Sequence, residues 1–307
     1  MTSEPSARFL PIALSEFGTP GGPAPAEPAA RYCEQLESGA VLYFPQTPIA
    51  IPDADREFLL RQKQTGAGYH KNIAYRPAED KLTGFAAEDA GERQRLQAVM
   101  RRYSQDVERF LACFLAPYQQ RWKKDYASFR PLEEEGRNLR LRARNDLLHT
   151  DAFPTRPTNG DRILRFFNNV NPAQGRKWMI TEPFHVLARQ FAGGPGIPLP
   201  KPAGNSALDR AWRRFTLRKR SPYDDFMMRF HNFLKENADF QANCPKYHFE
   251  FPPGSSWLAY TDTVSHAVLS GRYAVEQTFI ISHQAMVAPQ FAPVRVLEQM
   301  AGAPLTY

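Results

Sequence analysis

The chain has 307 residues, of which 42% are hydrophobic and 23% are charged, and its net charge is +7. This composition excludes a peptide module and a disordered chain and is typical of a soluble globular protein. The basic balance concerns partners rather than fold. It suits an anionic surface such as nucleic acid, acidic lipid or an acidic sugar, and it is equally compatible with simple solubility.

Cysteine usage and the apolar runs limit where the protein works. Cys33, Cys113 and Cys244 are odd in number and widely spaced, so they fit neither a disulfide framework nor a zinc knuckle and indicate a reducing compartment. The N-terminus shows no signal peptide, and no run of about 18 apolar residues is present, so we expect no bilayer-spanning helix. Attachment to a membrane surface remains open.

The first half of the chain predicts an arm followed by helices. Residues 1–30 are rich in Pro, Ala and Gly and predict an extended arm. Residues 31–45 predict a short helix, a turn at Gly39 and a strand. Residues 53–64 and 86–124 show helical periodicity. The apolar face of the longer segment, which we expect to pack on a sheet, consists of Leu96, Met100, Tyr103, Val107, Phe110, Leu111 and Leu115.

The middle of the chain predicts two strands and then helices. Residues 137–145 (NLRLRARND) alternate apolar and basic residues, which predicts a strand with one basic face. Residues 162–171 predict a strand after a turn at Gly160. Residues 182–192 and 206–241 look helical. Two helix starts are expected there: Ser206 with Asp209, and Ser221-Pro222 followed by Asp224 and Asp225.

The last part of the chain is again β-rich. Residues 247–251, 257–262, 264–269 and 273–282 predict strands separated by turns. Strands therefore occur on both sides of residues 182–241, which read as a helical insertion into one sheet assembly. We expect an α+β fold in which residues 1–307 form a single domain with flanking helices.

His149-Thr150-Asp151 carries the first chemical signal. At the end of a strand, residues two apart project from the same face, so an imidazole and a carboxylate can converge on one ion. His266, in a later strand, supplies the third ligand of a two-His-one-carboxylate site for non-haem iron. A small antiparallel jelly-roll barrel, the double-stranded β-helix, provides this geometry. A zinc hydrolase and purely structural histidines remain alternatives.

Arg272 follows His266 at the start of the next strand. Three protein ligands leave room on iron for a bidentate 2-oxo acid and dioxygen, and the far carboxylate of 2-oxoglutarate needs a cation such as arginine. The remaining histidines have no carboxylate at so suggestive a spacing, and His231 fits a core position of a helix. They are His70, His185, His231, His248 and His283.

Two blocks resemble a known family. RNDLLHTDAFPTRPTNGDRILRFFNNVNP (144–172) and WLAYTDTVSHAVLSGRYAVEQTFIIS (257–282) are similar to the Kdo hydroxylases. These are Fe(II)- and 2-oxoglutarate-dependent dioxygenases of Gram-negative bacteria. The resemblance implies hydroxylation of C3 of 3-deoxy-D-manno-oct-2-ulosonic acid (Kdo) on Kdo-lipid A, giving Ko in the lipopolysaccharide inner core. It also implies a cytoplasmic enzyme held peripherally on the inner membrane.

The resemblance also assigns residues. His149, Asp151 and His266 match the iron ligands, and Arg272 matches the arginine that holds the far carboxylate of 2-oxoglutarate. Gln277, further along the same strand, is a second candidate for that contact. Asp151 argues against a halogenase, in which a small residue leaves room for halide. Candidates for binding the acidic sugar are Arg144, Asn145, Arg162, Arg165 and Asn168.

A lipid-linked substrate requires contact with an anionic membrane. Residues 210–220 (RAWRRFTLRKR) are basic, with Trp212 and Phe215 interleaved, and predict such a contact. A salt-bridged surface helix is the alternative for this segment. For the whole protein, the alternatives are an oxygenase acting on another anionic substrate and a non-catalytic jelly-roll module that binds anionic lipid or lipopolysaccharide. We expect no nucleic-acid partner, because no aromatic and basic RNA-binding motif is present.

Overall fold

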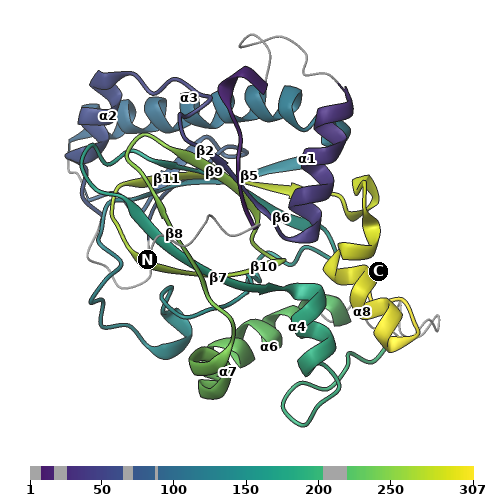
Figure 1. The fold of residues 1–307 in the computed structure, drawn as a ribbon. Helices are drawn as coiled ribbons and strands as arrows, with labels where there is room; N and C mark the ends of the chain where they lie inside the picture. Colours follow the sequence, from purple (N-terminus) through teal and green to yellow (C-terminus); the bar gives the residue numbers. More distant parts are fainter. Residues whose placement is uncertain (1–7, 17–25, 65–71, 87–88, 203–219) are drawn as a thin grey trace.

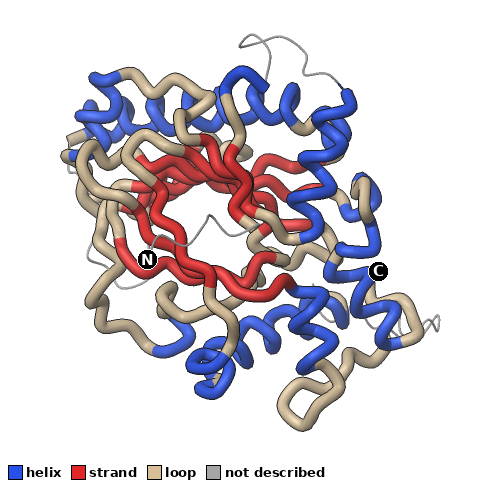
Figure 2. The backbone as a smooth tube through the Cα atoms, in the orientation of Figure 1, coloured by secondary structure: helices blue, strands red, loops and turns tan. Residues whose placement is uncertain are grey.

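The structure, a computed structural model, describes residues 8–16, 26–64, 72–86, 89–202 and 220–307. Two β-sheets face each other, and helices cover the outer side of each (Figure 1). Figure 2 shows the strands of both sheets as a flattened ring between two helical layers. The predicted α+β fold with a two-sheet β core is therefore confirmed.

The larger sheet has the strand order β1–β2–β9–β6–β11–β5–β3–β4. All of its neighbouring strands are antiparallel except β1 and β2, which are parallel. Its strands are β1 (Phe9–Pro11), β2 (Val41–Phe44), β3 (Ile73–Arg76), β4 (Lys81–Thr83), β5 (Trp122–Arg130), β6 (Arg162–Asn169), β9 (Ser256–Tyr260) and β11 (Ala274–Ile281).

The smaller sheet consists of β10 (Val264–Ser270), β7 (Arg176–Pro183) and β8 (Tyr247–Phe251), in that order. A backbone bridge between His149 and His266 adds a short fourth segment at its β10 edge. From β5 onward the chain passes repeatedly between the two sheets, which is the pattern expected of a jelly roll. The two sheets are thereby locked together by their connections.

Three helices cover the larger sheet: α1 (Ala26–Ser38), α2 (Asp53–Leu60) and α3 (Ala90–Phe114). Asp89 caps α3 by accepting a hydrogen bond from the amide of Gly91. The predicted apolar face of α3 is largely buried, as the helix packs beside β3, β4 and β5. This packing explains why the helical periodicity of that segment was informative.

The smaller sheet is flanked by α4 (Phe184–Phe191), α6 (Pro222–Glu236) and α7 (Ala238–Asn243) (Figure 1). All three belong to the predicted insertion, which lies between β7 and β8. Ser221 caps α6 through a capping box with Asp224, as its sequence predicts. The helix α8 (Pro293–Ala301) and five short 3-10 helices complete the described elements: Leu14–Glu16, Ala116–Tyr118, Leu141–Ala143, His283–Ala285 and Pro289–Phe291.

Several predicted elements differ from the structure. The expected arm at 1–30 contains strand β1 and the start of α1, because Phe9 is buried against the aromatic core. The helix expected to reach residue 124 ends at Phe114, since Pro117 lies in the next turn and β5 follows. Strand β7 lacks an alternating pattern and was not predicted. The helix start expected at Ser206 lies outside the described residues.

The predicted basic strand at 137–145 is wrong. Residues Leu141–Ala143 form a 3-10 turn, and among the described residues only Asn145, at the end of the segment, bonds to a strand, by accepting from the amide of Val268. Arg142 instead pairs with Glu236, and Arg144 pairs with Asp146. The alternation of arginine and leucine therefore reflects separate side-chain contacts rather than a β pleat.

One end of the space between the sheets is filled by aromatic side chains. Trp257 and Phe251 stack with their ring centroids 3.9 Å apart, and Phe167 stacks on Trp257 at 5.1 Å. Trp178 meets Trp257 edge to face at 5.5 Å. This packing closes the interior on that side and leaves a polar cavity beyond Phe167 and Trp178. No described helix is long and apolar enough to cross a membrane.

Candidate metal centre and adjoining cavity

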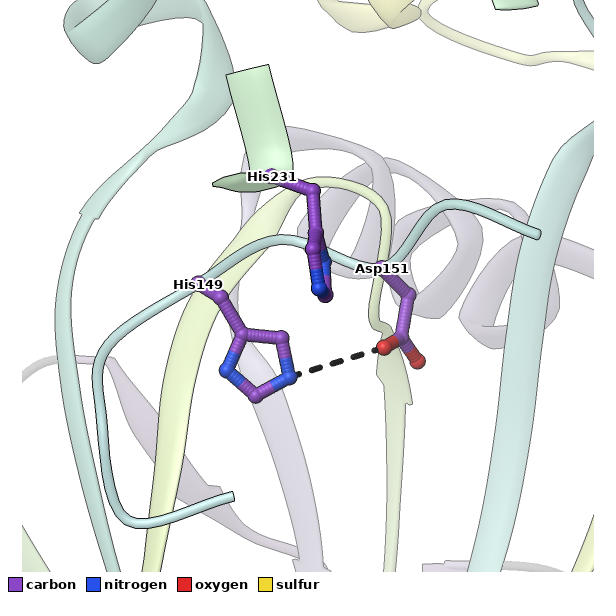
Figure 3. A group of neighbouring side chains, drawn as sticks. All are labelled: His149, Asp151 and His231. Atoms are coloured by element: carbon purple, nitrogen blue, oxygen red, sulfur yellow. Dashed lines mark ion pairs between the residues drawn. The ribbon is translucent and has the colours of Figure 1, made fainter. Parts of the chain in front are cut away.

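His149 and Asp151 lie on the short segment that extends the smaller sheet. The amide of His149 donates to the carbonyl of His266, and the amide of Asp151 donates to the carbonyl of Thr261. Because the two residues are two apart in an extended segment, their side chains share one face. Their ligand atoms, His149 Nε2 and Asp151 Oδ1, are 3.7 Å apart (Figure 3). The structure thus brings the predicted pair together.

His266 lies on β10 directly opposite His149. The centroids of the two imidazoles are 4.8 Å apart. The ring of His266 also stacks on Trp178 at 5.2 Å, which fixes its orientation. Both histidines and Asp151 line the same cavity, so the structure brings all three sequence-predicted ligands to one place.

The hydrogen bonds of the two imidazoles determine which nitrogen is free. Nδ1 of His149 lies 2.7 Å from the carbonyl oxygen of Leu147, and Nδ1 of His266 lies 2.9 Å from that of Val264. A carbonyl only accepts, so each Nδ1 carries the proton and each Nε2 keeps a free lone pair. This arrangement, with the far nitrogen tied to a carbonyl, is usual for metal-ligating histidines.

The charge states of these groups also suit a divalent cation. Burial lowers the pKa of His149 well below its ordinary value and lowers that of His266, so both imidazoles are neutral. Burial opposes ionisation of Asp151, but nearby positive charge, chiefly that of Arg165, holds the pKa of that carboxyl below its usual range. Two neutral imidazoles and one carboxylate fit the donor set of non-haem Fe(II).

Arg165 orients the carboxylate. Its Nη2 lies 3.0 Å from Asp151 Oδ2, without the alignment of a hydrogen bond, so the contact is an ion pair. Nη1 of Arg165 donates to Glu276 Oε1 at 3.1 Å. Because the arginine occupies the Oδ2 side, Asp151 Oδ1 is left facing His149. A carboxylate held in this way offers a metal one oxygen rather than two.

His231 is one of the residues near the site that sequence reasoning did not assign to it. It lies on α6, and its ring centroid is 4.9 Å from that of His149. One ligand atom each of His149, Asp151 and His231 lies within 4.8 Å of the others (Figure 3). Its Nδ1 lies 2.7 Å from the carbonyl oxygen of Thr150. The only sequence signal was that His231 is a polar residue on an otherwise apolar helix face. Its nearness to His149 could not be predicted, because the insertion brings it to the site from a distant part of the chain.

The cavity beside these ligands is strongly polar. It encloses about 360 Å³ including its open side, and Phe167, Trp178 and Val268 form its apolar walls. Its polar lining, apart from the three candidate ligands, consists of Arg130, Asn145, Arg165, Arg176 and Glu276. Three cations in so small a space indicate a site for a carboxylate-bearing molecule.

The three arginines are neutralised to different degrees. Arg130 forms a two-pronged pair with Glu276, Nε to Oε2 at 3.2 Å and Nη2 to Oε1 at 2.9 Å. Arg165 contacts Asp151 and Glu276, as above. The acid nearest to Arg176 is Glu134, with Oε1 3.7 Å from Nη2. Arg176 is therefore the least neutralised of the three arginines and the one best able to pair with a bound anion.

Arg176 is held in place by the backbone. Its Nη1 donates to the carbonyl of Gly271 at 2.6 Å, and within the described part of the chain its buried Nε has no hydrogen-bond partner. A Cβ on Gly271 would lie 2.9 Å from the Cα of Arg176, and the φ of Gly271 is +108°, so this close approach requires glycine. Burial lowers the pKa of Arg176 to about 10. A bound carboxylate would offset that desolvation.

Arg272 and Gln277 do not line the cavity, which corrects their expected role. The exposed side chain of Arg272 lies over the ring of its neighbour Tyr273, 4.7 Å from the centroid. Gln277 lies on the opposite face of β11 from Glu276, and its Nε2 donates to the carbonyls of Asp125 and Thr278. Strand alternation explains the position of Gln277, because its neighbour Glu276 faces the cavity. Arg272 precedes β11, and the positive φ of Tyr273 (64°) interrupts the strand between them.

Of the predicted substrate residues, the structure places Asn145 and Arg165 in the cavity and the other three elsewhere. Arg144 pairs with Asp146 outside it. Arg162 is fully buried, donates to Asp262 and lies over the ring of Tyr260 at 4.2 Å. Asn168 points to the helical layer, where it accepts a hydrogen bond from Tyr103. These three are corrected to structural contacts.

Comparisons with known proteins agree with this geometry. The model of the family described as 3-deoxy-D-manno-oct-2-ulosonic acid (Kdo) hydroxylase matches residues 22–304. Among solved structures, the Kdo hydroxylase KdoO, a non-heme Fe(II) alphaketoglutarate dependent dioxygenase, is similar in its complex with alphaketoglutarate and Fe(III): 31% identity, 97% of both chains and a TM-score of 0.82. Its cobalt(II) complex gives 32%, 97% of both chains and 0.83.

A third solved structure of the same hydroxylase, in complex with succinate and Fe(III), is 31% identical over 97% of both chains with a TM-score of 0.82. No curated protein matches the chain. The family match over nearly the whole sequence and the shared architecture lead to one conclusion. The chain belongs to the Kdo hydroxylase family of non-haem Fe(II)- and 2-oxoglutarate-dependent dioxygenases.

Proposed function

We propose that the protein hydroxylates C3 of Kdo carried on Kdo-lipid A, and that His149, Asp151 and His266 hold its iron. One observation carries this proposal. Two imidazoles whose Nδ1 atoms are bound to carbonyls, and one oriented carboxylate, meet beside a cavity lined by arginines. Iron bound there with 2-oxoglutarate and dioxygen supplies the oxidation that places one oxygen atom on a C–H carbon and yields succinate and carbon dioxide.

His266 rather than His231 is our choice for the third ligand. His266 lines the cavity together with His149 and Asp151, and it faces His149 across a fixed backbone pair. His231 also has its Nδ1 bound to a carbonyl, but it lies on the insertion and outside the cavity lining. The chosen set places all three ligands on adjacent segments of the β framework, which is the more rigid support.

Arg176 is our candidate for the far carboxylate of 2-oxoglutarate. Its guanidinium is buried, has the weakest acidic partner of the three cavity arginines and keeps an unpaired Nε–H. Trp178 lies two residues along β7 and presents its own buried Nε1–H, which has no partner among the described residues. Residues two apart share a strand face, so both groups are directed into the cavity. Arg176 thereby takes the role that the sequence suggested for Arg272.

The sugar is expected near Asn145 and Arg165, the two predicted substrate residues that line the cavity. Asn145 donates to Glu134, and Arg165 contacts Asp151, so both are oriented before substrate arrives. The apolar walls limit the water that reaches the reacting carbon. Preorganised polar groups in such a site lose little entropy when the substrate binds.

Because the proposed substrate carries a lipid, we infer that the reaction takes place at the cytoplasmic surface of the inner membrane. The net charge of +7 and the basic, aromatic segment 210–220 support contact with anionic lipid. That segment lies outside the described residues except for Arg220. Replacement of Arg213, Arg214 and Arg218 by Glu is expected to weaken sedimentation with anionic vesicles. Unchanged sedimentation would contradict the membrane proposal.

The test of the activity uses the purified protein with Fe(II), 2-oxoglutarate, dioxygen and Kdo-lipid A. We expect equal amounts of succinate and a product that is one oxygen atom heavier, with the new hydroxyl on C3 of the sugar. His149→Ala is expected to remove both products. A lipopolysaccharide-binding module without catalysis would instead bind Kdo-lipid A and form no succinate, and oxygen insertion at another carbon would contradict the proposed position.

A further inference from the structure

The segment that carries His149 and Asp151 has two backbone edges with different partners. On one edge, His149 exchanges hydrogen bonds with His266, and Asp151 donates to Thr261. Successive residues of an extended segment direct their amides and carbonyls to opposite sides, so those of Leu148 and Thr150 point the other way. That second edge faces α6 and α7 of the insertion. An edge buried there requires partners for its polar groups.

Gln241 of α7 supplies two of these partners. Its Oε1 accepts a hydrogen bond from the amide of Leu148 at 3.0 Å, and its Nε2 donates to the carbonyl of the same residue at 2.9 Å. The side-chain amide therefore pairs with Leu148 as the backbone of a neighbouring strand would. The same Nε2 lies 2.7 Å from the carbonyl of Leu234 on α6, which holds the side chain in position.

Two residues of α6 bind further backbone carbonyls, one within the extended segment and one at the 3-10 turn that precedes it. Nδ1 of His231 donates to the carbonyl of Thr150 at 2.7 Å. Nζ of Lys235 donates to the carbonyls of Arg142 and Arg144 at 3.1 and 2.7 Å. Lys235 is only 3% exposed, so its ammonium is committed to these acceptors rather than to solvent. Three side chains of the insertion thus bind backbone groups before and between the proposed ligands, at Arg142, Arg144, Leu148 and Thr150.

We propose that His231, Lys235 and Gln241 form a side-chain ladder that replaces a missing strand and positions His149 and Asp151 for metal binding. The inference rests on the proposed metal ligands. The ladder residues are positioning residues: Gln241 fixes the backbone immediately before His149, and His231 fixes it between His149 and Asp151. The helical insertion therefore contributes to the metal site without supplying a ligand.

The physical consequence is preorganisation. With only the β10 side paired, the segment could rotate about its single set of bridges, and the two ligand side chains would sample geometries that do not converge. Binding the segment on both edges reduces that freedom before the metal arrives. Loss of an outer partner of a metal ligand commonly costs about 10–100-fold in metal affinity, and we expect the lower end here because the ladder acts through the backbone.

The test measures Co(II) binding to the metal-free protein and amide hydrogen exchange in the same state. Gln241→Met keeps the shape of the side chain but removes its polar atoms, and His231→Phe keeps a ring without the N–H. Each is expected to raise the Kd for Co(II) about tenfold. Each is also expected to speed exchange at the amide of His149. That amide bonds to His266 and not to the ladder, so it reports on the segment as a whole.

Matched variants separate positioning from ligation and from general destabilisation. His231→Asn places a side-chain N–H where Nδ1 stood and is expected to recover most of the Co(II) affinity. Asn243→Ala removes an exposed hydrogen bond to Asp239 on the same helix as Gln241 and should leave both readouts unchanged. Thermal unfolding of each variant shows whether it is folded. If Gln241→Met does not fold, His231→Phe carries the test.

The outcomes that overturn the ladder are specific. In folded Gln241→Met or His231→Phe, a Co(II) affinity within twofold of the parent and unchanged exchange at His149 would contradict it. Loss of Co(II) binding in His231→Phe as complete as in His149→Ala, with no recovery in His231→Asn, would make His231 a ligand and overturn its positioning role. Full Co(II) affinity in His149→Ala would instead refute the proposed metal site itself.

Discussion

His149 and His266 form a reciprocal backbone pair: the amide of His149 donates to the carbonyl of His266 at 3.1 Å, and the amide of His266 donates to the carbonyl of His149 at 2.9 Å. The two imidazoles therefore face each other because of register, not because of flexible side chains. A shift of one residue would turn either ring to the other face of the sheet. The backbone pairing thus fixes the separation of the two imidazoles before a metal binds.

This pairing predicts a large effect of His266→Ala with little change in fold. One of three proposed ligands is lost while the backbone pair remains, so we expect the Kd for Co(II) to rise by more than about 100-fold, beyond the range typical of outer-sphere changes. Titration followed by the visible absorption of Co(II) measures it. His185→Ala, on α4 away from the cavity, is the matched control. Equal effects of the two substitutions would refute ligation by His266.

Arg176→Met is expected to weaken the binding of 2-oxoglutarate. A hydrogen bond to a charged group contributes about 1.5–3 kcal/mol, so the KM for 2-oxoglutarate should rise about 10–100-fold, while the Kd for Co(II) changes much less. Arg272→Met tests the position favoured by the sequence and should leave that KM unchanged, because its side chain is exposed over Tyr273. A larger effect of Arg272→Met than of Arg176→Met would reverse the assignment.

The sequence predicts the ligand pair and its partner strand because those signals are local. His149-x-Asp151 shares a face by strand alternation, and β10 and β11 have clear boundaries at Gly271 and the preceding turn. The helix α3 has an unbroken apolar stripe and was also predicted, apart from its end. In each case the pattern that specifies the element lies within the element.

The remainder depends on contacts between distant segments. Arg176 lies on a strand that sequence reasoning did not predict, and His231 reaches the site only because the insertion folds back on the smaller sheet. An arginine near a motif gives no indication of which way its side chain points. Arg162 and Arg165 were both predicted to bind the sugar, but they lie three apart on one strand and point to opposite faces. The structure shows Arg162 paired with Asp262 and Arg165 in the cavity.

Arg162→Met is expected to lower the free energy of unfolding rather than to impair the reaction directly. It would leave Asp262 as a buried, unpaired carboxylate, and breaking such a pair from one side costs about 3–5 kcal/mol. Urea unfolding measures the change. Arg142→Met, which breaks the exposed pair with Glu236, should change the free energy of unfolding far less.

A second substitution checks the cause. If the loss comes from the unpaired carboxylate, Arg162→Met combined with Asp262→Leu should recover much of the stability, because no charge remains buried. A raised KM for Kdo-lipid A in Arg162→Met with unchanged unfolding free energy would instead restore Arg162 to the substrate site.

Stability at alkaline pH should depend on Cys33. The thiol lies on α1 and is fully buried, and burial raises its pKa from about 9 to about 12. Below pH 9 both the native and the unfolded chain keep the thiol proton, so this group adds no pH dependence. Between about pH 9 and 12 the unfolded chain loses the proton and the native protein retains it. The free energy of unfolding then falls with rising pH, by up to about 1.4 kcal/mol per pH unit from this one group.

The variant Cys33→Ala tests this dependence, because it removes the titrating thiol. Its free energy of unfolding should fall less steeply with pH than that of the parent between pH 9 and 11, whatever the stability of the variant at pH 7. Urea unfolding at several pH values measures both slopes, and parallel slopes would show that Cys33 ionises as readily in the native protein as in the unfolded chain.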